Sequence, residues 1–144
     1  MKQERVRDRM TTPVVTISPQ TNLVNAYSLM KERHIRRLPV IEEGRLVGIV
    51  TRGDLRAALA AHAEDLDVFR IAFHLDQLAV SQAMTREVIT ITPQATLAEA
   101  ARLMIEHEIG GLPVVEGDQL VGILTEADLF RSVMQRAAAV PNPK

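Results

Sequence analysis

Two stretches of this chain decide its fold, because the second is a copy of the first. The first copy is Leu38-Pro-Val-Ile-Glu-Glu-Gly-Arg-Leu-Val-Gly-Ile-Val-Thr-Arg-Gly-Asp54. The second is Leu112-Pro-Val-Val-Glu-Gly-Asp-Gln-Leu-Val-Gly-Ile-Leu-Thr-Glu-Ala-Asp128. Each contains two apolar runs joined by a polar turn, which is typical of a β-hairpin. Each ends in Thr-x-x-Asp at the start of a helix-prone run.

The similarity extends well beyond the two stretches. A shift of 74 positions aligns the two halves without a gap from Met10 to Leu55. Identical pairs occur all along this alignment; they include Met10/Met84, Thr11/Thr85, Pro19/Pro93, Met30/Met104, Pro39/Pro113, Gly48/Gly122, Thr51/Thr125 and Asp54/Asp128. The chain is therefore an internal duplication.

Each half predicts the same order of elements. A short β-branched run at residues 14–17 or 88–91 is followed by a helical pattern beginning at Leu23 or Leu97. The hairpin and a second helix complete a β-α-β-β-α repeat, so the fold class is α+β with two tandem repeats. A segment of roughly 55 residues buries too little surface to be a stable domain on its own. We therefore expect the two repeats to pack about a pseudo-twofold axis.

The expected division of the chain follows the repeat. Residues 1–60 form repeat 1 with its N-terminal segment, and residues 80–137 form repeat 2. Residues 61–79 break the repeat but keep helical spacing, which predicts a helical linker, and residues 138–144 predict a flexible tail.

Composition excludes several classes of protein. The 144 residues carry a formal net charge of −1, which argues against binding to a nucleic-acid backbone. The chain has no cysteine, so disulfides and thiolate chemistry are excluded. No run approaches the ~18 apolar residues of a membrane span, and the start lacks the apolar core of a secretion signal. We expect a cytoplasmic protein with neither nucleic acid nor membrane as partner.

The repeated pieces resemble the CBS-domain pair, the tandem module named after cystathionine β-synthase. They are Met-Thr before a short strand, Pro-x-x-x-Leu opening a helix, Leu-Pro-Val, Leu-Val-Gly-Ile and Thr-x-x-Asp, all present twice and in order. The resemblance runs from about Val6 to about Val133. It implies one module with two clefts between the repeats, an adenine nucleotide or S-adenosylmethionine as ligand, and modules paired into homodimers.

The Thr-x-x-Asp pattern has two interpretations. At a helix start, the threonine hydroxyl can accept a backbone N–H while the carboxylate lies at the positive end of the helix. Alternatively, the carboxylate can accept hydrogen bonds from both hydroxyls of a ribose, because its two oxygens match a vicinal diol. The resemblance favours ribose binding for at least one copy.

The resemblance also implies that each cleft is composite. The stronger cleft would be formed by Thr12, Ile35, Arg36, Arg37, Thr125 and Asp128. The weaker cleft would be formed by Thr51, Asp54, Arg86, Ile109, Gly110 and Gly111. Two adjacent arginines can bind phosphates bidentately, although they can also form a solvated edge or pair with Glu32. We therefore expect a phosphorylated nucleotide at Asp128, and a cleft at Asp54 that binds more weakly, stays empty or takes a less charged ligand.

The aliphatic residues beside these positions also have two interpretations. Their side chains could sandwich an adenine ring, or they could be ordinary core; they are Val14, Ile35, Val88 and Ile109.

The sequence offers nothing for catalysis or metal binding. It lacks the phosphate-binding Gly-x-x-x-x-Gly-Lys-[Ser/Thr] and the nucleophile motif Gly-x-Ser-x-Gly. The four histidines show no metal spacing. The expected function is a regulatory, ligand-sensing module that does no chemistry and signals to an effector protein or through its dimer. The alternative is a structural or oligomerisation module with vestigial clefts.

Overall fold

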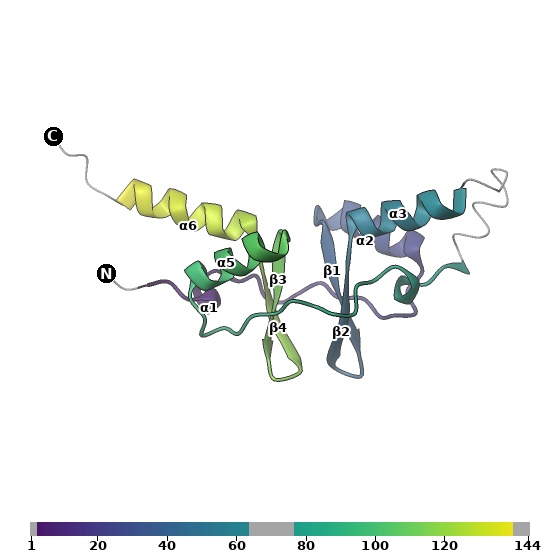
Figure 1. The fold of residues 1–144 in the computed structure, drawn as a ribbon, viewed down its shortest axis with the longest axis horizontal. Coiled ribbons are helices and arrows are strands. Elements are labelled where there is room, and N and C mark those ends of the chain that lie inside the picture. The colour runs from purple at the N-terminus through teal and green to yellow at the C-terminus, as the bar shows by residue number, and fades with distance from the viewer. Residues whose placement is uncertain (1–2, 64–76, 140–144) are drawn as a thin grey trace. The chain divides into compact units, whose positions relative to one another are not determined.

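The computed structural model describes residues 3–63 and 77–139, which fold into helices and short strands (Figure 1). The first half contains α1 (Val6–Arg9), α2 (Leu23–Arg33), β1 (Arg37–Glu42), β2 (Arg45–Thr51) and α3 (Arg52–Ala63). The second half contains the 3-10 helix η1 (Val80–Gln82), α5 (Leu97–His107), β3 (Gly111–Glu116), β4 (Gln119–Thr125) and α6 (Glu126–Ala139). Most of the expected linker and tail lies outside the described residues.

The two predicted hairpins are confirmed. Strands β1 and β2 pair antiparallel in one two-stranded sheet, and β3 and β4 pair antiparallel in another. Both registers shift at the same place, after Val40 and after Val114. In the first turn, Glu43 and Gly44 both have positive φ, at 51° and 78°. This backbone matches the right-handed twist of the strands.

Side chains cap the starts of α2 and α5. The side chain of Asn22 accepts a hydrogen bond from the backbone N–H of Asn25 at 2.7 Å, at the start of α2. At the start of α5, Thr96 and Glu99 form a capping box, in which each side chain accepts a hydrogen bond from the other's backbone N–H. Local sequence therefore positions both helices.

The expected strands at 14–17 and 88–91 are not formed as strands. Each is reduced to one bridging residue: Ile17 pairs in parallel with Val40, and Ile91 pairs in parallel with Val114. The prolines at positions 19 and 93 follow two residues later and have no N–H to continue a ladder. The β-branched residues therefore do not form a regular strand, and each run makes only a single bridge to the hairpin.

The chain separates into two compact units that do not follow the order of the sequence. Unit 1 comprises Met1–Val14 and Ile89–Lys144, and unit 2 comprises Val15–Val88. The segment that precedes each repeat therefore belongs to the unit of the other repeat. We call residues 3–14 the first leading segment and residues 77–88 the second. Figure 1 shows α1, on the first leading segment, with α5, β3 and β4.

Hydrogen bonds hold the leading segments at equivalent places in both units. In unit 1, the N–H of Val6 donates to the carbonyl of Ala95 at 2.8 Å, and Thr11 exchanges two backbone hydrogen bonds with Ile123. The same bonds recur in unit 2 at positions shifted by 74: Val80 N–H to the Thr21 carbonyl at 2.7 Å, and Thr85 with Ile49. Each leading segment thus adds a bridge beside the second hairpin strand.

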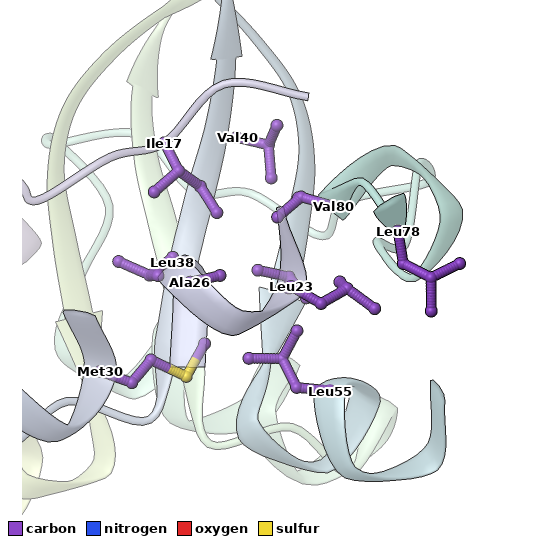
Figure 2. Packing of buried hydrophobic residues seen from close by; sticks show 10 residues of the cluster. Ile17, Leu23, Ala26, Met30, Leu38, Val40, Leu55, Leu78 and Val80 are labelled. Atoms are coloured by element: carbon purple, nitrogen blue, oxygen red, sulfur yellow. The ribbon is translucent and has the colours of Figure 1, made fainter. Parts of the chain in front are cut away.

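Each unit has its own hydrophobic core. The unit 2 core contains Ile17, Leu23, Ala26, Met30, Leu38, Val40, Val50, Leu55, Leu78 and Val80, most of them labelled in Figure 2. The unit 1 core contains Val6, Ile91, Ala100, Met104, Leu112, Val114 and Leu124. Val6 and Val80 are both fully buried, and each comes from a leading segment. Neither core is complete without the segment that precedes the other repeat.

A methionine and a glycine meet at the corresponding place in each unit. A Cβ added to Gly122 would lie 2.6 Å from the sulfur and 2.9 Å from Cγ of Met10. A Cβ added to Gly48 would lie 2.6 Å from the sulfur of Met84 and 3.0 Å from the carbonyl oxygen of Thr85. The glycine in each Leu-Val-Gly-Ile therefore makes room for the methionine of a leading segment.

We expect Gly122→Ala to lower the free energy of unfolding by about 1–3 kcal/mol, because the methyl group overpacks the contact with Met10. Urea unfolding measures this change. In a Met10→Ala background the same substitution should cost less, and a double-mutant cycle detects that coupling.

The matched control is Gly53→Ala. Its added Cβ would meet nothing closer than the Thr51 hydroxyl at 3.7 Å, and Ala127 already occupies the equivalent position. Stability should be unchanged or raised by up to about 1 kcal/mol. Equal losses for Gly122→Ala and Gly53→Ala would contradict the packing explanation.

Candidate functional site

The first Thr-x-x-Asp forms a reciprocal cap at the start of α3. The backbone N–H of Thr51 donates to Oδ2 of Asp54 at 2.9 Å, and the N–H of Asp54 donates to the Thr51 hydroxyl at 3.1 Å. Asp54 is half-buried. Within the described part of the chain, no donor lies on its other carboxylate oxygen, Oδ1. The capping interpretation is confirmed here, and it leaves part of the carboxylate available.

The second Thr-x-x-Asp is more fully engaged. Both the N–H and the hydroxyl of Thr125 donate to Oδ2 of Asp128, at 2.9 and 3.2 Å. Nη1 of Arg131 lies 3.1 Å from Oδ1 and forms an ion pair with it. The Asp128 side chain is only 9% exposed, whereas that of Arg131 is 65% exposed. The two copies of one motif therefore present different carboxylates.

The residues just before each Leu-Pro-Val lie beside the Thr-x-x-Asp of their own repeat. In unit 2, Arg37 pairs with Thr51 across the hairpin, and the carbonyl of Arg36 accepts the N–H of Arg52 at 2.8 Å.

The same arrangement recurs in unit 1. Gly111 pairs with Thr125, and the carbonyl of Gly110 accepts the N–H of Glu126 at 3.1 Å. The composite groupings, Arg36 and Arg37 with Asp128 and the two glycines with Asp54, stay predictions.

The leading segments bring two further predicted residues into the expected units. Thr12 is exposed and follows Thr11, which bridges Ile123 two residues before Thr125 in unit 1. Arg86 is exposed and follows Thr85, which bridges Ile49 two residues before Thr51 in unit 2.

The aliphatic positions are partly core. Ile35 and Ile109 are half-buried and pack against the cores of units 2 and 1. Val14 and Val88 are also half-buried.

Two arginines close in sequence to the aspartates were absent from the predicted site. Arg131 was missed because it lies one helical turn after Asp128, outside the repeated motif. Arg52 lies directly after Thr51, and its Nε is buried with no hydrogen-bond partner in the described chain. The sequence signal for both is a difference between the repeats: Arg52 is aligned with Glu126, and Arg131 is aligned with Ala57.

A polar cluster fastens the first leading segment to α6. The guanidinium of Arg9 forms two hydrogen bonds with the Glu4 carboxylate, at 2.7 and 2.8 Å. The hydroxyl of Ser132, a residue that is 3% exposed, donates to the same carboxylate at 2.6 Å. The hydrogen bond from Arg9, followed by that from Ser132, lowers the pKa of Glu4 from 4.5 to about 2.

The other unit replaces this cluster with apolar residues. The positions equivalent to Glu4, Arg9 and Ser132 are Leu78, Ala83 and Ala58. Leu78 is buried in the core of unit 2. At these three positions the first leading segment makes charge-assisted hydrogen bonds, whereas the second makes apolar contacts.

Glu4→Gln should reduce stability most at neutral pH. The folded-state pKa lies below the ordinary value, so the carboxylate stabilises the fold fully above about pH 4.5. This contribution is lost as the pH falls toward 2. The difference in free energy of unfolding between wild type and variant should therefore shrink over that window, which urea titrations at several pH values measure.

Glu106→Gln controls for the loss of one negative charge, because it removes a carboxylate from an exposed position of α5. A difference between wild type and Glu4→Gln that stays constant from pH 7 to pH 2 would contradict the role given to the Glu4 cluster.

The described residues contain no group of three or more histidines, cysteines or carboxylates that could hold a metal ion. In the same part of the chain, no helix is both long and apolar enough to cross a membrane.

Comparisons with known proteins agree with the duplicated architecture. The family model described as CBS domain matches residues 6–61 and again residues 80–135. The chain is 35% identical over 134 residues to the CBS domain-containing protein YhcV of Bacillus subtilis, covering 93% of this chain and 89% of that protein.

Two similar solved structures contain ligands. One is the CBS domain pair of protein MJ0100 in complex with 5′-methylthioadenosine and S-adenosyl-L-methionine. It has a TM-score of 0.80 and 28% identity, and the match covers 94% of this chain and 99% of that one. The other is CBSX2 in complex with AMP, with a TM-score of 0.76 and 30% identity, covering 92% and 98%.

Proposed function

The chain belongs to the CBS domain family, and from that membership we propose that it is a regulatory module that binds an adenine nucleotide or S-adenosylmethionine. The observation that carries the proposal is the pair of carboxylates, Asp54 and Asp128, each fixed by a threonine at a helix start. Two similar structures contain ligands with an adenosine moiety. In this proposal the protein senses a ligand and performs no reaction.

The carboxylates suit the ribose part of such a ligand. A vicinal diol has two O–H donors, and a carboxylate offers about four acceptor positions. Each threonine fixes the aspartate with its backbone N–H, so little side-chain entropy remains to be lost when a ligand binds. Deoxyribose lacks one of the two donors and would leave an acceptor unsatisfied.

The phosphate part of the ligand is assigned to arginines. We keep the prediction that Arg36 and Arg37 bind the phosphates of the nucleotide whose ribose is bound by Asp128. A ligand that contacts both repeats would stabilise one arrangement of them over others, and an effector protein could recognise that arrangement.

Binding should raise the thermal stability of the protein. A ligand at ten times its dissociation constant adds about 1.4 kcal/mol to the free energy of unfolding. We expect at least one of ATP, ADP, AMP and S-adenosylmethionine to produce this shift, and GTP to produce less. Asp54→Asn and Asp128→Asn should each weaken binding at one site, and 2′-deoxy-AMP should bind more weakly than AMP.

Asn keeps the size of the aspartate side chain while removing its charge, so the variants test the ribose contact itself. No thermal shift with any of the four adenine compounds at millimolar concentration would refute the ligand-sensing proposal.

The phosphate assignment has its own test. Reversing the charge at both positions, Arg36→Glu with Arg37→Glu, should abolish nucleotide binding at the Asp128 site. Isothermal titration with AMP in an Asp54→Asn background isolates that site. The charge-matched control is Lys31→Glu with Arg33→Glu at exposed positions near the end of α2, which should leave the affinity within about twofold. Equal affinities for the two double variants would remove Arg36 and Arg37 from the site.

An oligomerisation module is the second candidate, favoured by one surface. Phe130, Val133 and Met134 are spaced along one side of α6 and are 62, 65 and 69% exposed. The corresponding positions of the first repeat are Arg56, Leu59 and Ala60, so this apolar stripe belongs to unit 1 alone. Clustered exposed apolar side chains of this kind typically mark an interface. We propose that a second copy of the chain covers the stripe.

Sedimentation velocity tests the pairing. Val133→Glu places an uncompensated charge in the stripe and should shift the protein from dimer to monomer at micromolar concentration. Gln135→Glu, which adds the same charge at another exposed position of α6, should not. A wild-type protein that sediments as a monomer would refute the proposed pairing.

A further inference from the structure

The ion pair between Asp128 and Arg131 distinguishes the two candidate sites more sharply than the repeated motif does. Arg131 reaches the buried carboxylate from one turn further along α6, while most of its own side chain stays in solvent. In the first repeat the equivalent residue is Ala57, an exposed position on α3. Asp54 has no such counter-ion within the described chain.

The hydrogen-bond capacity of each carboxylate shows what this difference means for a ligand. Of about four acceptor positions on a carboxylate, Asp128 has two occupied by Thr125 and one by Arg131. A diol needs two. Asp54 has only the position taken by the Thr51 N–H occupied. A ribose can therefore bind Asp54 directly, but at Asp128 it has to displace Arg131.

We propose that Arg131 makes the Asp128 site selective for ligands with an anionic phosphate over neutral nucleosides; the inference rests on the proposed function. When a diol takes the Asp128 carboxylate, the Arg131 guanidinium loses its counter-ion. A phosphate on the same ligand supplies a new one, because guanidinium and phosphate form strong, often bidentate hydrogen bonds. Adenosine brings the diol without the phosphate, so it breaks the ion pair without replacing it.

The alternative role for Arg131 is purely structural. Oppositely charged residues three apart on a helix stabilise it slightly whatever ligand is present. That role predicts a small change in stability in Arg131→Ala and no change in the relative affinities of AMP and adenosine. The ratio of the two affinities therefore separates the two roles, because both ligands contain the same base and diol.

The experiment measures dissociation constants for AMP and adenosine by isothermal titration in an Asp54→Asn background. Arg131→Ala should tighten adenosine binding about 1.5- to 5-fold, the factor expected for removing a competing ion pair whose arginine is exposed. It should weaken AMP binding about tenfold or more, through loss of a charge-assisted hydrogen bond. Arg131→Lys keeps the charge and should lie between wild type and Arg131→Ala.

The reciprocal substitution places an arginine at the equivalent position of the first repeat, where it can compete with the diol for Asp54. In an Asp128→Asn background, Ala57→Arg should weaken adenosine binding at Asp54 and raise the preference for AMP. Arg102→Ala, at an exposed position of α5, controls for a general loss of positive charge in unit 1. It should leave the ratio unchanged.

The outcomes separate this inference from the proposed function. A wild-type protein that binds neither AMP nor adenosine refutes both. The role of Arg131 alone is refuted if the protein binds AMP but the ratio of its affinities for AMP and adenosine is unchanged in Arg131→Ala and in Ala57→Arg. A ratio that falls in the first variant and rises in the second supports it. If Arg131→Ala fails to fold, the Ala57→Arg measurement alone decides.

Discussion

The contact between each leading segment and the hairpin of the other repeat is the interaction on which the rest of this structure depends. Met10 lies over Gly122, and Met84 lies over Gly48, each at a place where a side chain on the hairpin would collide with the methionine. Val6 and Val80 continue the same segments into the two cores and are fully buried there. A single repeat would lack both the methionine and the valine that complete its unit. In this chain, each repeat therefore depends on the leading segment of the other.

The two units attach their leading segments through different side-chain contacts. In unit 2, Leu78 fastens the leading segment by burial; in unit 1, the Glu4 carboxylate does so through Arg9 and Ser132. Hydrophobic contact depends little on pH, whereas the ionised cluster is strong only while Glu4 is charged. The first leading segment also includes Thr12, a predicted ligand residue in the same unit as Asp128. The hydrogen bond between Glu4 and Ser132 therefore ties the segment that carries Thr12 to the helix that carries Asp128.

The capping and binding interpretations of Thr-x-x-Asp turn out to be compatible. The threonine N–H holds one oxygen of the aspartate at the start of each helix, and the capping geometry thereby fixes a carboxylate that a ribose could use. The difference between the copies comes from residues around the motif. Arg131 forms an ion pair with Asp128 from within the same helix, whereas Arg52, two residues before Asp54, has a buried Nε that is unpaired in the described chain. The two copies of the motif therefore differ in their contacts, and the contrast between Arg36-Arg37 and Gly110-Gly111 stays a prediction.

The sequence by itself determined what depends on neighbours along the chain: the duplication, the two hairpins, the caps of α2 and α5, and the α+β class. These features follow from turn residues, capping side chains and periodicity, which act within a few positions. Only the tertiary structure decided that the strands at 14–17 and 88–91 shrink to bridges and that each leading segment packs with the other repeat. It also decided that Arg131 forms an ion pair with Asp128. These outcomes depend on contacts between residues far apart in the chain, or on which of several partners a long side chain meets. No local pattern specifies either one.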